Sequence, residues 1–550
     1  MTESTATSVD LSRIVKAYDI RGVAFEEFTV EAARALGAAF ADLLDAGDMV
    51  VAHDMRVSSP ALAEAFADGA LTRGSTVAFA GLSSTDQLYC ASGLFHAAGA
   101  QFTASHNPAP DNGIKMCFPG ARPVGRDSGL LEVRDGAQRY LEAGHIEVRD
   151  GGRLESVDTL ADYIATMTAL VPVPPTRPLR VVVDAANAMA GHTVPALAER
   201  LENIEIIPLY FELDGTFPNH EANPLDPANL RDLQEAVRAH GADLGLAFDG
   251  DADRCIVVDE RAEIVPPSAI TAMIAEAEIA RARAAGEDEP AVVANLVSSR
   301  IVAQTIEAAG GRHIRSRVGH SLIKAIMADN NAVFGGEHSA HFYFRDFYFA
   351  DSGMLAALHV LRALASTDLP LSELVARFNP YAASGEINSV VDSVDEATER
   401  VLAHVAALPG VESDTLDGLT LTHWDDSMAP GERWWVSLRP SNTEPLLRLN
   451  VEAEEAATMV RVRDELLALI RAEAEPEAEA EVEPGVEPAG PSPVPAWVED
   501  LLACPVCHGS LSIDAREARC ADCGARYEVS DGIPVLIPPA AEPSDEPADG

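Results

Sequence analysis

The chain has 550 residues, of which 47% are hydrophobic and 23% are charged, and its formal net charge is −47 at pH 7. This length exceeds what one hydrophobic core organises, so several domains are expected, and the hydrophobic fraction excludes an intrinsically disordered chain. The acidic charge also argues against binding to nucleic acid or to an anionic membrane, because both would repel the protein.

The sequence predicts a cytoplasmic protein. Its first residues, MTESTATSVDLSR, lack a basic start and an apolar stretch, and no run of about 18 apolar residues follows. The seven cysteines do not make a disulfide framework in so long a chain, and four of them form two CxxC pairs, which must stay reduced to bind metal.

Short apolar runs alternate with helical stretches along most of the chain. Near the N-terminus, DMVVAHD and STVAFAG alternate with EAARALGAAFADLLDAG and ALAEAFADGALTRG, a pattern typical of a layered α/β domain. Similar cycles begin at LRVVVDAANAMAG and AVVANLVSS, after proline-rich or charged breaks. The fold class is therefore α/β. We expect three similar α/β/α layered domains at 10–150 (domain I), 151–262 (domain II) and 263–382 (domain III), a smaller α+β domain at 383–472 (domain IV), an acidic linker at 473–494 and a cysteine-containing module at 495–540.

The segment TASHNPAPDNGIK in domain I holds a candidate nucleophile. Ser105 lies among small and polar residues in a segment bounded by prolines and Asn-Gly, which predicts an exposed loop. A serine hydroxyl is a weak nucleophile unless a base, a cation or phosphorylation activates it, and His106 and Lys115 are candidate helpers. Taken alone, this serine is more typical of a turn that caps a helix.

The segment DGDADR in domain II is a candidate metal site. It follows the apolar run ADLGLAF and places Asp249, Asp251 and Asp253 at alternate positions, so an extended backbone would direct all three carboxylates the same way. Three hard oxygen ligands suit Mg²⁺, which also accepts phosphate oxygens. An EF-hand would need glycine in place of Arg254 and helical flanks, so it is rejected, whereas a solvated acidic turn stays open.

Two further segments offer hydrogen-bonding groups suited to a sugar phosphate. GGEHSAHFYFRD in domain III presents Glu337 and Ser339 beside two glycines, which suits adjacent sugar hydroxyls. RPSNTEPLLR in domain IV presents an arginine and three small donors, a combination that a phosphate monoester needs. These four residues are Arg439, Ser441, Asn442 and Thr443.

Together, TASHNP, DGDADR, GGEHSAH and RPSNTEP resemble the α-D-phosphohexomutase family over about residues 10–472. The resemblance implies four domains around a central cleft, each contributing one loop: phosphoserine, metal, sugar and phosphate-binding. It implies that Ser105 and the three aspartates hold Mg²⁺, and that phosphorylated Ser105 donates its phosphoryl group to a hexose phosphate. The resulting hexose 1,6-bisphosphate turns around and returns its other phosphate to Ser105.

The resemblance also assigns roles to residues outside these loops. Arg21 and Lys115 are implied near the transferring group, and Lys115 is the candidate for proton transfer because a buried lysine can lose its proton. The implied substrate contacts are Tyr18, His320 and His341.

The chain departs from the family pattern in two places. Ser84, Thr85 and Asp86 stand where relatives commonly have threonine-proline. Val297 stands where some relatives carry a substrate-binding lysine, so the phosphate contacts of domain III are left open.

The sugar segment GEHSAH resembles the phosphomannomutase and phosphoglucomutase branch. Mannose and glucose differ at one hydroxyl, so a site that reads the 3- and 4-hydroxyls through Glu337 and Ser339 can accept both. Phosphomannomutase is favoured, with glucose 1,6-bisphosphate or mannose 1,6-bisphosphate as activator. Phosphoglucomutase or dual specificity is the alternative, and phosphoglucosamine mutase is less favoured.

The C-terminal module contains CPVC and CADC, two CxxC pairs separated by twelve residues. The spacing predicts a structural Zn²⁺ site formed by four thiolates, with iron or a redox dithiol pair as alternatives. The module resembles small zinc-ribbon proteins that activate methyltransferases, which implies a methyltransferase as candidate partner. An inactive scaffold that recruits such a partner is the alternative class of function. The predicted ligands are Cys504, Cys507, Cys520 and Cys523.

Overall fold

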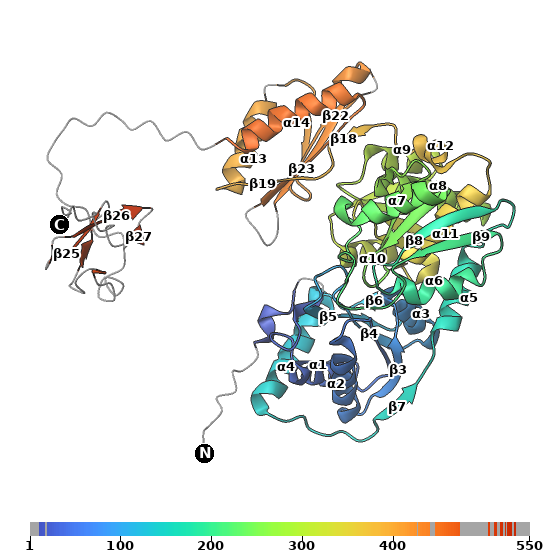
Figure 1. Ribbon diagram of the computed structural model, residues 1–550, viewed down its shortest axis with the longest axis vertical. Helices are drawn as coiled ribbons and strands as arrows, with labels where there is room; N and C mark the ends of the chain where they lie inside the picture. The colour runs from blue at the N-terminus through green and yellow to red at the C-terminus, as the bar shows by residue number, and fades with distance from the viewer. Residues whose placement is uncertain are drawn as a thin grey trace, which may run out of the picture. The chain divides into compact units, whose positions relative to one another are not determined.

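The computed structural model describes residues 10–16, 19–406, 408–425, 427–440 and 446–472, and in the C-terminal part residues 504–505, 511–513, 517–520, 523, 525–530 and 533–534. The chain forms two compact units, Met1–Ala472 and Glu473–Gly550. In the first unit four sheets follow one another along the sequence, coloured from blue to orange in Figure 1. No helix in the described ranges is both long and apolar enough to cross a membrane.

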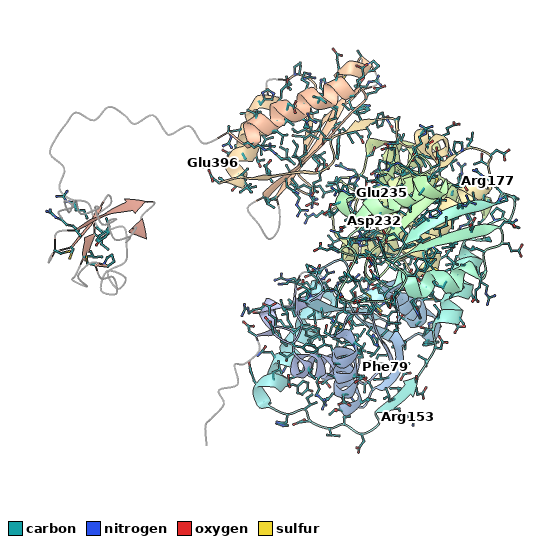
Figure 2. All side chains as sticks on the ribbon, in the orientation of Figure 1. Phe79, Arg153, Arg177, Asp232, Glu235 and Glu396 are labelled. Carbon is teal, nitrogen blue, oxygen red and sulfur yellow. The ribbon has the colours of Figure 1, made fainter. Side chains whose placement is uncertain are left out.

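Domain I is built on a mixed sheet with the order β1-β5-β4-β2-β3-β7, and β6 pairs with β5. Its strands are β1 (Ile20–Val23), β2 (Met49–His53), β3 (Thr76–Leu82), β4 (Ala98–Phe102), β5 (Asp111–Phe118), β6 (Arg122–Pro123) and β7 (Arg153–Ser156). Its helices are η1 (Leu11–Arg13), α1 (Val30–Leu43), α2 (Ser59–Thr72), α3 (Thr85–Phe95), η2 (Arg126–Ser128) and α4 (Leu130–Ala143). β7 lies at the edge beside β3, where Figure 2 labels Arg153 and Phe79, so the sheet of domain I extends past the boundary expected at residue 150.

The layering of domain I follows from the alternation of side chains along its strands. Met49 and Val51 of β2 join the core formed with α1, α2 and α4, whereas Val50 and Ala52 pack against α3 on the other face. Helix α3 begins where the Ser84 hydroxyl accepts a hydrogen bond from the backbone N–H of Gln87. The sheet is thus covered on both faces, as the α/β pattern predicted.

Domains II and III each contain a five-stranded sheet and share one hydrophobic core. The order is β12-β11-β10-β8-β9 in domain II and β14-β13-β15-β16-β17 in domain III. Because β12 pairs with β11, the sheet of domain II extends past the boundary expected at residue 262. The elements of domain II are α5 (Leu160–Leu170), β8 (Leu179–Asp184), α6 (Ala190–Ala198), β9 (Ile204–Leu209), η3 (Pro227–Leu230), α7 (Arg231–His240), β10 (Leu244–Phe248), β11 (Cys255–Asp259) and β12 (Ile264–Val265). Those of domain III are α8 (Pro267–Ala284), β13 (Ala291–Asn295), α9 (Arg300–Ala308), β14 (Arg312–Ser316), α10 (His320–Asp329), β15 (Phe334–Gly336), β16 (Phe342–Phe344), η4 (Arg345–Phe347), β17 (Ala350–Asp351), α11 (Gly353–Ala365) and α12 (Leu371–Ala376).

Domain IV is an antiparallel sheet with the order β18-β23-β22-β21-β20, and β19 also pairs with β23. Its elements are β18 (Ala382–Ala383), β19 (Ile387–Val390), α13 (Val394–Val405), β20 (Glu412–Asp414), β21 (Leu419–His423), η5 (Pro430–Glu432), β22 (Trp434–Pro440), β23 (Leu446–Ala453) and α14 (Ala456–Ile470). One face of the sheet, including Leu421 and Val436, packs with α13 and α14 into a separate core.

In the second unit, β24 (Leu511–Ile513), β25 (Glu517–Cys520), β26 (Arg526–Ser530) and β27 (Ile533–Pro534) pair antiparallel in sequence order. A small buried cluster joins Cys504 and Cys520 to Leu511, Ile513 and Tyr527.

Candidate active site

Ser105 lies in the turn between the antiparallel strands β4 and β5. Its backbone has a φ of 52°, a left-handed conformation that is uncommon for a residue with a side chain, and its backbone N–H donates to Thr103 Oγ1 at 2.9 Å. Only 2% of Ser105 is exposed, so the prediction of an exposed loop serine was wrong. The turn connects two strands and begins no helix, which also removes the helix-cap interpretation.

Arg56 stabilises this turn through hydrogen bonds to its backbone carbonyls. Its Nη2 donates to the carbonyls of Ser105 and Asn107 at 2.9 and 2.7 Å, and its Nη1 donates to those of Pro108 and Asp111 at 2.7 and 3.0 Å. The guanidinium is 1% exposed and pairs with a neighbouring carboxylate. Sequence reasoning missed Arg56, because nothing in HDMR indicates a contact with residues about 50 positions away.

The three aspartates stand in the tight turn between β10 and β11, and each is at most 1% exposed. Ala252 has a φ of 62°, so the carboxylates converge through a turn and not through the extended backbone that the spacing suggested. Gly250 is required because a Cβ there would lie 2.2 Å from the carbonyl oxygen of Ser105. This close approach brings the Ser105 Oγ within 2.8 Å of Asp249 Oδ2, to which it donates a hydrogen bond.

Two buried cations offset part of the negative charge of the three aspartates. Lys115, on β5, contacts Asp251 Oδ2 at 2.7 Å and Asp253 Oδ2 at 2.5 Å. Arg254 donates from Nε to Asp249 Oδ2 and from Nη2 to Ser105 Oγ, both at 2.9 Å. Sequence reasoning used Arg254 only to reject an EF-hand; its place directly after the third aspartate was the available signal.

The charges of this cluster shift the ionisation of its members. Burial lowers the pKa of Lys115, but the two carboxylates more than offset it, so the net pKa is raised; the premise that burial releases its proton was wrong. Burial, aided by Arg254 and Arg21, lowers the pKa of His106 to about 2 and leaves it neutral. Burial raises the pKa of Asp249 to about 7 although Arg254 opposes this.

The aspartate triad fits a hard divalent cation. One ligand atom from each of Asp249, Asp251 and Asp253 lies within 4.8 Å of the others. Oδ1 of Asp251 and Oδ1 of Asp253 are buried and accept no hydrogen bond within the described part of the chain. Carboxylate oxygens so arranged are the donors that Mg²⁺ prefers.

Arg21 lies beside the serine turn. It donates from Nε to Asp19 Oδ2 at 2.8 Å, and from Nη1 to Asn107 Oδ1 at 2.8 Å and to the carbonyl of Ala104 at 3.2 Å. Strand β1 brings it there by pairing with β5.

The sugar segment of domain III reaches the same cluster through His341. Its Nε2 lies 3.8 Å from Asp253 Oδ1, and its Nδ1 lies 3.4 Å from Glu337 Oε2 and 3.1 Å from Ser339 Oγ. Burial lowers the pKa of His341, but Glu337 and Asp253 raise it above its usual value overall. Glu337 is 1% exposed and accepts hydrogen bonds from Asn295, the Gly319 N–H and the Tyr343 hydroxyl.

The departure at residues 84–86 forms part of this cluster. The Thr85 hydroxyl donates to Asp251 Oδ2 at 2.5 Å. The Asp86 carboxylate, fully buried, accepts hydrogen bonds from the hydroxyls of Ser84, Tyr163 and Ser352 at 2.6, 2.7 and 2.6 Å. Because these donors belong to domains I, II and III, the Asp86 carboxylate links three domains next to Thr85, which contacts Asp251.

The remaining predicted residues are placed in part. Arg439 lies on β22, where Asp417 pairs with its Nε at 3.3 Å, and His320 is the first residue of α10. Tyr18, Ser441, Asn442 and Thr443 lie outside the described residues.

The cysteine module brings three of its four predicted ligands together. The Sγ atoms of Cys504, Cys520 and Cys523 lie within 4.8 Å of one another, and Cys504 Sγ is 3.0 Å from the Tyr527 hydroxyl. Cys507 lies outside the described residues.

Comparison with known proteins finds matches over most of the first unit of the chain. Four phosphoglucomutase/phosphomannomutase family models match: alpha/beta/alpha domain I at 12–138, domain II at 161–262, domain III at 266–381 and the C-terminal domain at 386–469. A protein named "Phosphohexose mutases" from Xanthomonas campestris pv. campestris is 38% identical over 462 residues, covering 83% of this chain and 98% of that protein. A phosphomannomutase from Escherichia coli is 36% identical over 470 residues, with the same coverage of 83% and 98%.

Among solved structures, a phosphoglucomutase/phosphomannomutase family protein from Burkholderia thailandensis matches with a TM-score of 0.73 and 29% identity, covering 83% of this chain and 97% of that one. The fold and these matches define an isomerase of the α-D-phosphohexomutase type. The chain belongs to the phosphoglucomutase/phosphomannomutase family.

Proposed function

We propose that the chain interconverts mannose 6-phosphate and mannose 1-phosphate, with Ser105 as the phosphoryl carrier. The observation that carries this proposal is the contact of Ser105 Oγ with Asp249 and Arg254, at 2.8 and 2.9 Å, inside a buried cluster of carboxylates and cations. The preference for mannose rests on the phosphomannomutase named among the relatives. Phosphoglucomutase or dual specificity is the alternative, because the relative from Xanthomonas campestris has the broader name of phosphohexose mutase.

In the proposed cycle, phosphorylated Ser105 transfers its phosphoryl group to the free hydroxyl of the bound sugar phosphate. The bond between phosphorus and Ser105 Oγ breaks, a bond to the sugar oxygen forms, and the proton of the sugar hydroxyl ends on Ser105 Oγ. The bisphosphorylated sugar then returns its other phosphate to Ser105 by the reverse step. Glucose 1,6-bisphosphate or mannose 1,6-bisphosphate would prime the enzyme.

The residues of the cluster divide this work. Asp249, Asp251 and Asp253 would hold Mg²⁺ together with a phosphate oxygen on Ser105. When bound, Mg²⁺ offsets the negative charge that spreads over the phosphoryl oxygens. Arg254 orients Ser105 Oγ and adds a second positive charge.

The proposed proton carrier is Lys115, which its two carboxylate partners keep protonated. Its raised pKa makes it a weak acid, so Mg²⁺ bound to Asp251 and Asp253 would have to lower that pKa. Lys115 would then give its proton to Ser105 Oγ as the phosphoryl group leaves and take the proton of the sugar hydroxyl in return. His106 keeps a proposed role as a neutral hydrogen-bonding neighbour, 3.3 Å from Ser105 Oγ. Its low pKa argues against a role as the base.

Substrate binding is proposed from the other loops. Protonated His341, 3.8 Å from Asp253, would contact a substrate phosphate. Ser339 and Glu337 would form hydrogen bonds with the sugar hydroxyls. For Glu337 this requires an exchange of partners, because both of its carboxylate oxygens already accept hydrogen bonds. Tyr18, His320, Arg439, Ser441, Asn442 and Thr443 complete the proposed substrate contacts.

A phosphoenzyme experiment tests the carrier directly. The protein is incubated with mannose 1,6-bisphosphate and Mg²⁺, and its intact mass and peptides are measured beside those of Ser105→Ala. One phosphate on the peptide that contains Ser105, absent from the variant, supports the proposal. Phosphate on another residue, or none, refutes it.

The second proposal concerns the C-terminal module, for which we propose one structural Zn²⁺ held by Cys504, Cys507, Cys520 and Cys523. The convergence of three thiols, two of them buried, suits the thiolate ligands that zinc takes. A methyltransferase stays the proposed partner on resemblance alone.

A further inference from the structure

Arg439 is held by a residue that no sequence motif singled out. Asp417 stands in the turn between β20 and β21, and one of its oxygens, Oδ2, lies 3.3 Å from Arg439 Nε. The contact is an ion pair without the geometry of a hydrogen bond. The turn fits closely over β22: Gly418 has a φ of 74°, and a Cβ there would lie 2.6 Å from the carbonyl oxygen of Leu438. The turn is therefore packed directly against the strand that carries the arginine.

The same carboxylate oxygen also reaches domain III. Asp417 Oδ2 accepts a hydrogen bond from the backbone N–H of Val318 at 2.9 Å. Val318 stands two residues before His320, in the loop that leads into α10, and Gly319 donates from its backbone to Glu337. One oxygen thus joins the phosphate-loop arginine to the loop that supports the sugar segment.

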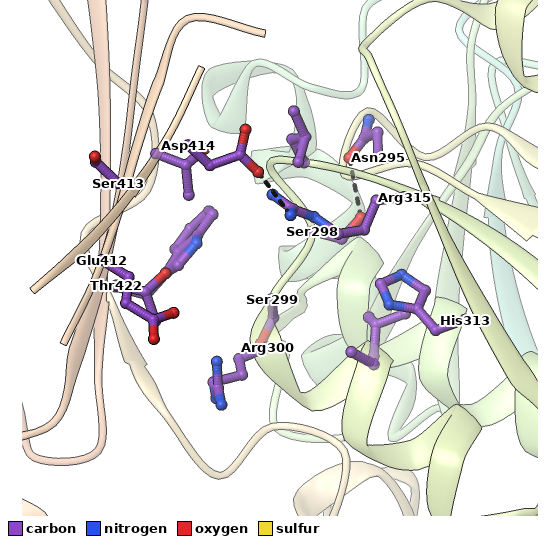
Figure 3. Close-up of a pocket in the computed structure, with 15 residues that line it drawn as sticks. Asn295, Ser298, Ser299, Arg300, His313, Arg315, Glu412, Ser413, Asp414 and Thr422 are labelled. Carbon is purple, nitrogen blue, oxygen red and sulfur yellow. Dashed lines mark hydrogen bonds and ion pairs between the residues drawn. The ribbon is translucent and has the colours of Figure 1, made fainter. Parts of the chain in front are cut away.

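In the part of the chain that the structure describes, Asp417 makes one of few polar contacts in a region of the boundary between domains III and IV that is not close-packed. A pocket of about 350 Å³ lies between them, lined by Arg300, His313 and Arg315 on one side and by Glu412, Asp414 and Thr422 on the other (Figure 3). Other polar links around it are the Arg315–Asp414 ion pair at 2.7 Å and the hydrogen bond from Arg300 N to Glu452 at 2.9 Å. Of these three carboxylates, Asp417 is the one that contacts Arg439.

The geometry of the pair leaves the arginine available to a ligand. Asp417 faces the Nε atom, and within the described residues the two Nη atoms of Arg439 have no hydrogen bond or ion pair. An arginine fork that is anchored at Nε loses less rotational freedom when its Nη atoms bind a phosphate.

We propose that Asp417 is a positioning residue: it holds Arg439 ready for the substrate phosphate and ties it to the Val318 loop of domain III. This inference rests on the proposed function, in which Arg439 is one of the substrate contacts, and it assigns to Arg439 the phosphate that is not being transferred. The opposite reading is that Asp417 competes with the phosphate for Arg439. The two readings predict opposite signs for the effect of removing the charge.

The test compares Asp417→Asn with Asp414→Asn, which loses the Arg315 ion pair between the same domains but not a contact with Arg439. Positioning predicts that KM for mannose 1-phosphate rises about tenfold in Asp417→Asn while kcat changes less than about threefold, and that Asp414→Asn stays near wild type. An unchanged or lower KM in Asp417→Asn overturns the inference. So does an equal rise in both variants, which would indicate a general loosening of the two domains.

A binding measurement separates this inference from the proposed function. Calorimetric titration of mannose 6-phosphate into the full chain, carried out without turnover in the Ser105→Ala background, should show about tenfold weaker binding when Asp417→Asn is added. Equal affinity overturns the positioning role even if the wild-type enzyme is an active mutase. A wild-type chain that binds mannose 6-phosphate but does not isomerise it would instead refute the proposed function.

Discussion

Ser105 Oγ donates a hydrogen bond to Asp249 Oδ2 at 2.8 Å across 144 positions of the sequence. The contact exists because Gly250 lets the turn after β10 approach the serine turn of domain I without a side chain between them. The proposed nucleophile and the proposed metal-binding turn come from different domains, and this contact holds them against each other.

Replacing Arg254 with lysine keeps the charge but removes the fork that joins Asp249 to Ser105 Oγ. We expect kcat to fall about 100-fold, because one preorganised donor at the reacting oxygen is lost. Steady-state kinetics check this beside Arg261→Lys, a substitution at an exposed arginine whose partner is Glu260. An Arg254→Lys enzyme with the kcat of wild type would contradict the role.

Replacing Lys115 with methionine should expose the competition between this lysine and a metal. The variant leaves Asp251 and Asp253 without their buried cation, so in chelator it should be less stable by about 3 kcal/mol. Added Mg²⁺ should then raise its melting temperature more than that of wild type, since the cation takes over the same carboxylates.

The matched control is Arg177→Met, which removes another cation, paired with Asp243 at 2.9 Å and in contact with none of the three aspartates. This variant should lose stability without gaining a larger response to Mg²⁺. Equal responses in the two variants would show that Lys115 does not stand in for the metal.

Asp86 should give the protein a pH-dependent stability. Burial raises its pKa from 3.8 to about 6, although three hydroxyls donate to it. Because the folded state binds this proton more tightly than the unfolded state, the stabilisation is fully present below about pH 4 and is lost as the pH rises through about 6, by roughly 3 kcal/mol.

The check is the melting temperature of wild type and Asp86→Asn between about pH 5 and about pH 7.5. The wild-type value should fall relative to that of the variant as the pH rises, since asparagine does not titrate. A difference that stays constant across this range would exclude Asp86 as the titrating group.

The C-terminal module should contain one Zn²⁺ per chain, measured by elemental analysis of the full-length, reduced protein. Cys520→Ser should lose it, because a structural site needs all four thiolates. Cys90→Ser, at a buried cysteine of domain I, serves as the control and should keep the metal. Zinc-free wild-type protein, or a Cys520→Ser protein that retains a full equivalent, would disprove the site.

Much of the fold could be predicted because its signals are local. The alternation in DMVVAHD and the 3.6-residue period in EAARALGAAFADLLDAG predicted β2 and α1, and domain IV follows from its strand pair and terminal helix. The shared core of domains II and III could not be predicted, since periodicity identifies the buried face of a helix but not its partner.

The candidate site also contains residues that the sequence predicted and residues that it did not. Ser105 and the aspartates were found because they stand in short recognisable segments, yet their burial was missed, since the polar composition of TASHNP indicates exposure. Arg56, Thr85 and Asp86 were missed as functional supports because their contacts cross about 50 to 270 residues. The pKa of Lys115 was misjudged because burial was considered without the two carboxylates beside it.

The most direct test of the account is the conversion of mannose 1-phosphate to mannose 6-phosphate with Mg²⁺ and catalytic glucose 1,6-bisphosphate, measured for wild type and Ser105→Ala, with glucose 1-phosphate assayed in parallel. The account predicts conversion by wild type, favouring mannose, and none above background by the variant. Full activity in Ser105→Ala would contradict it.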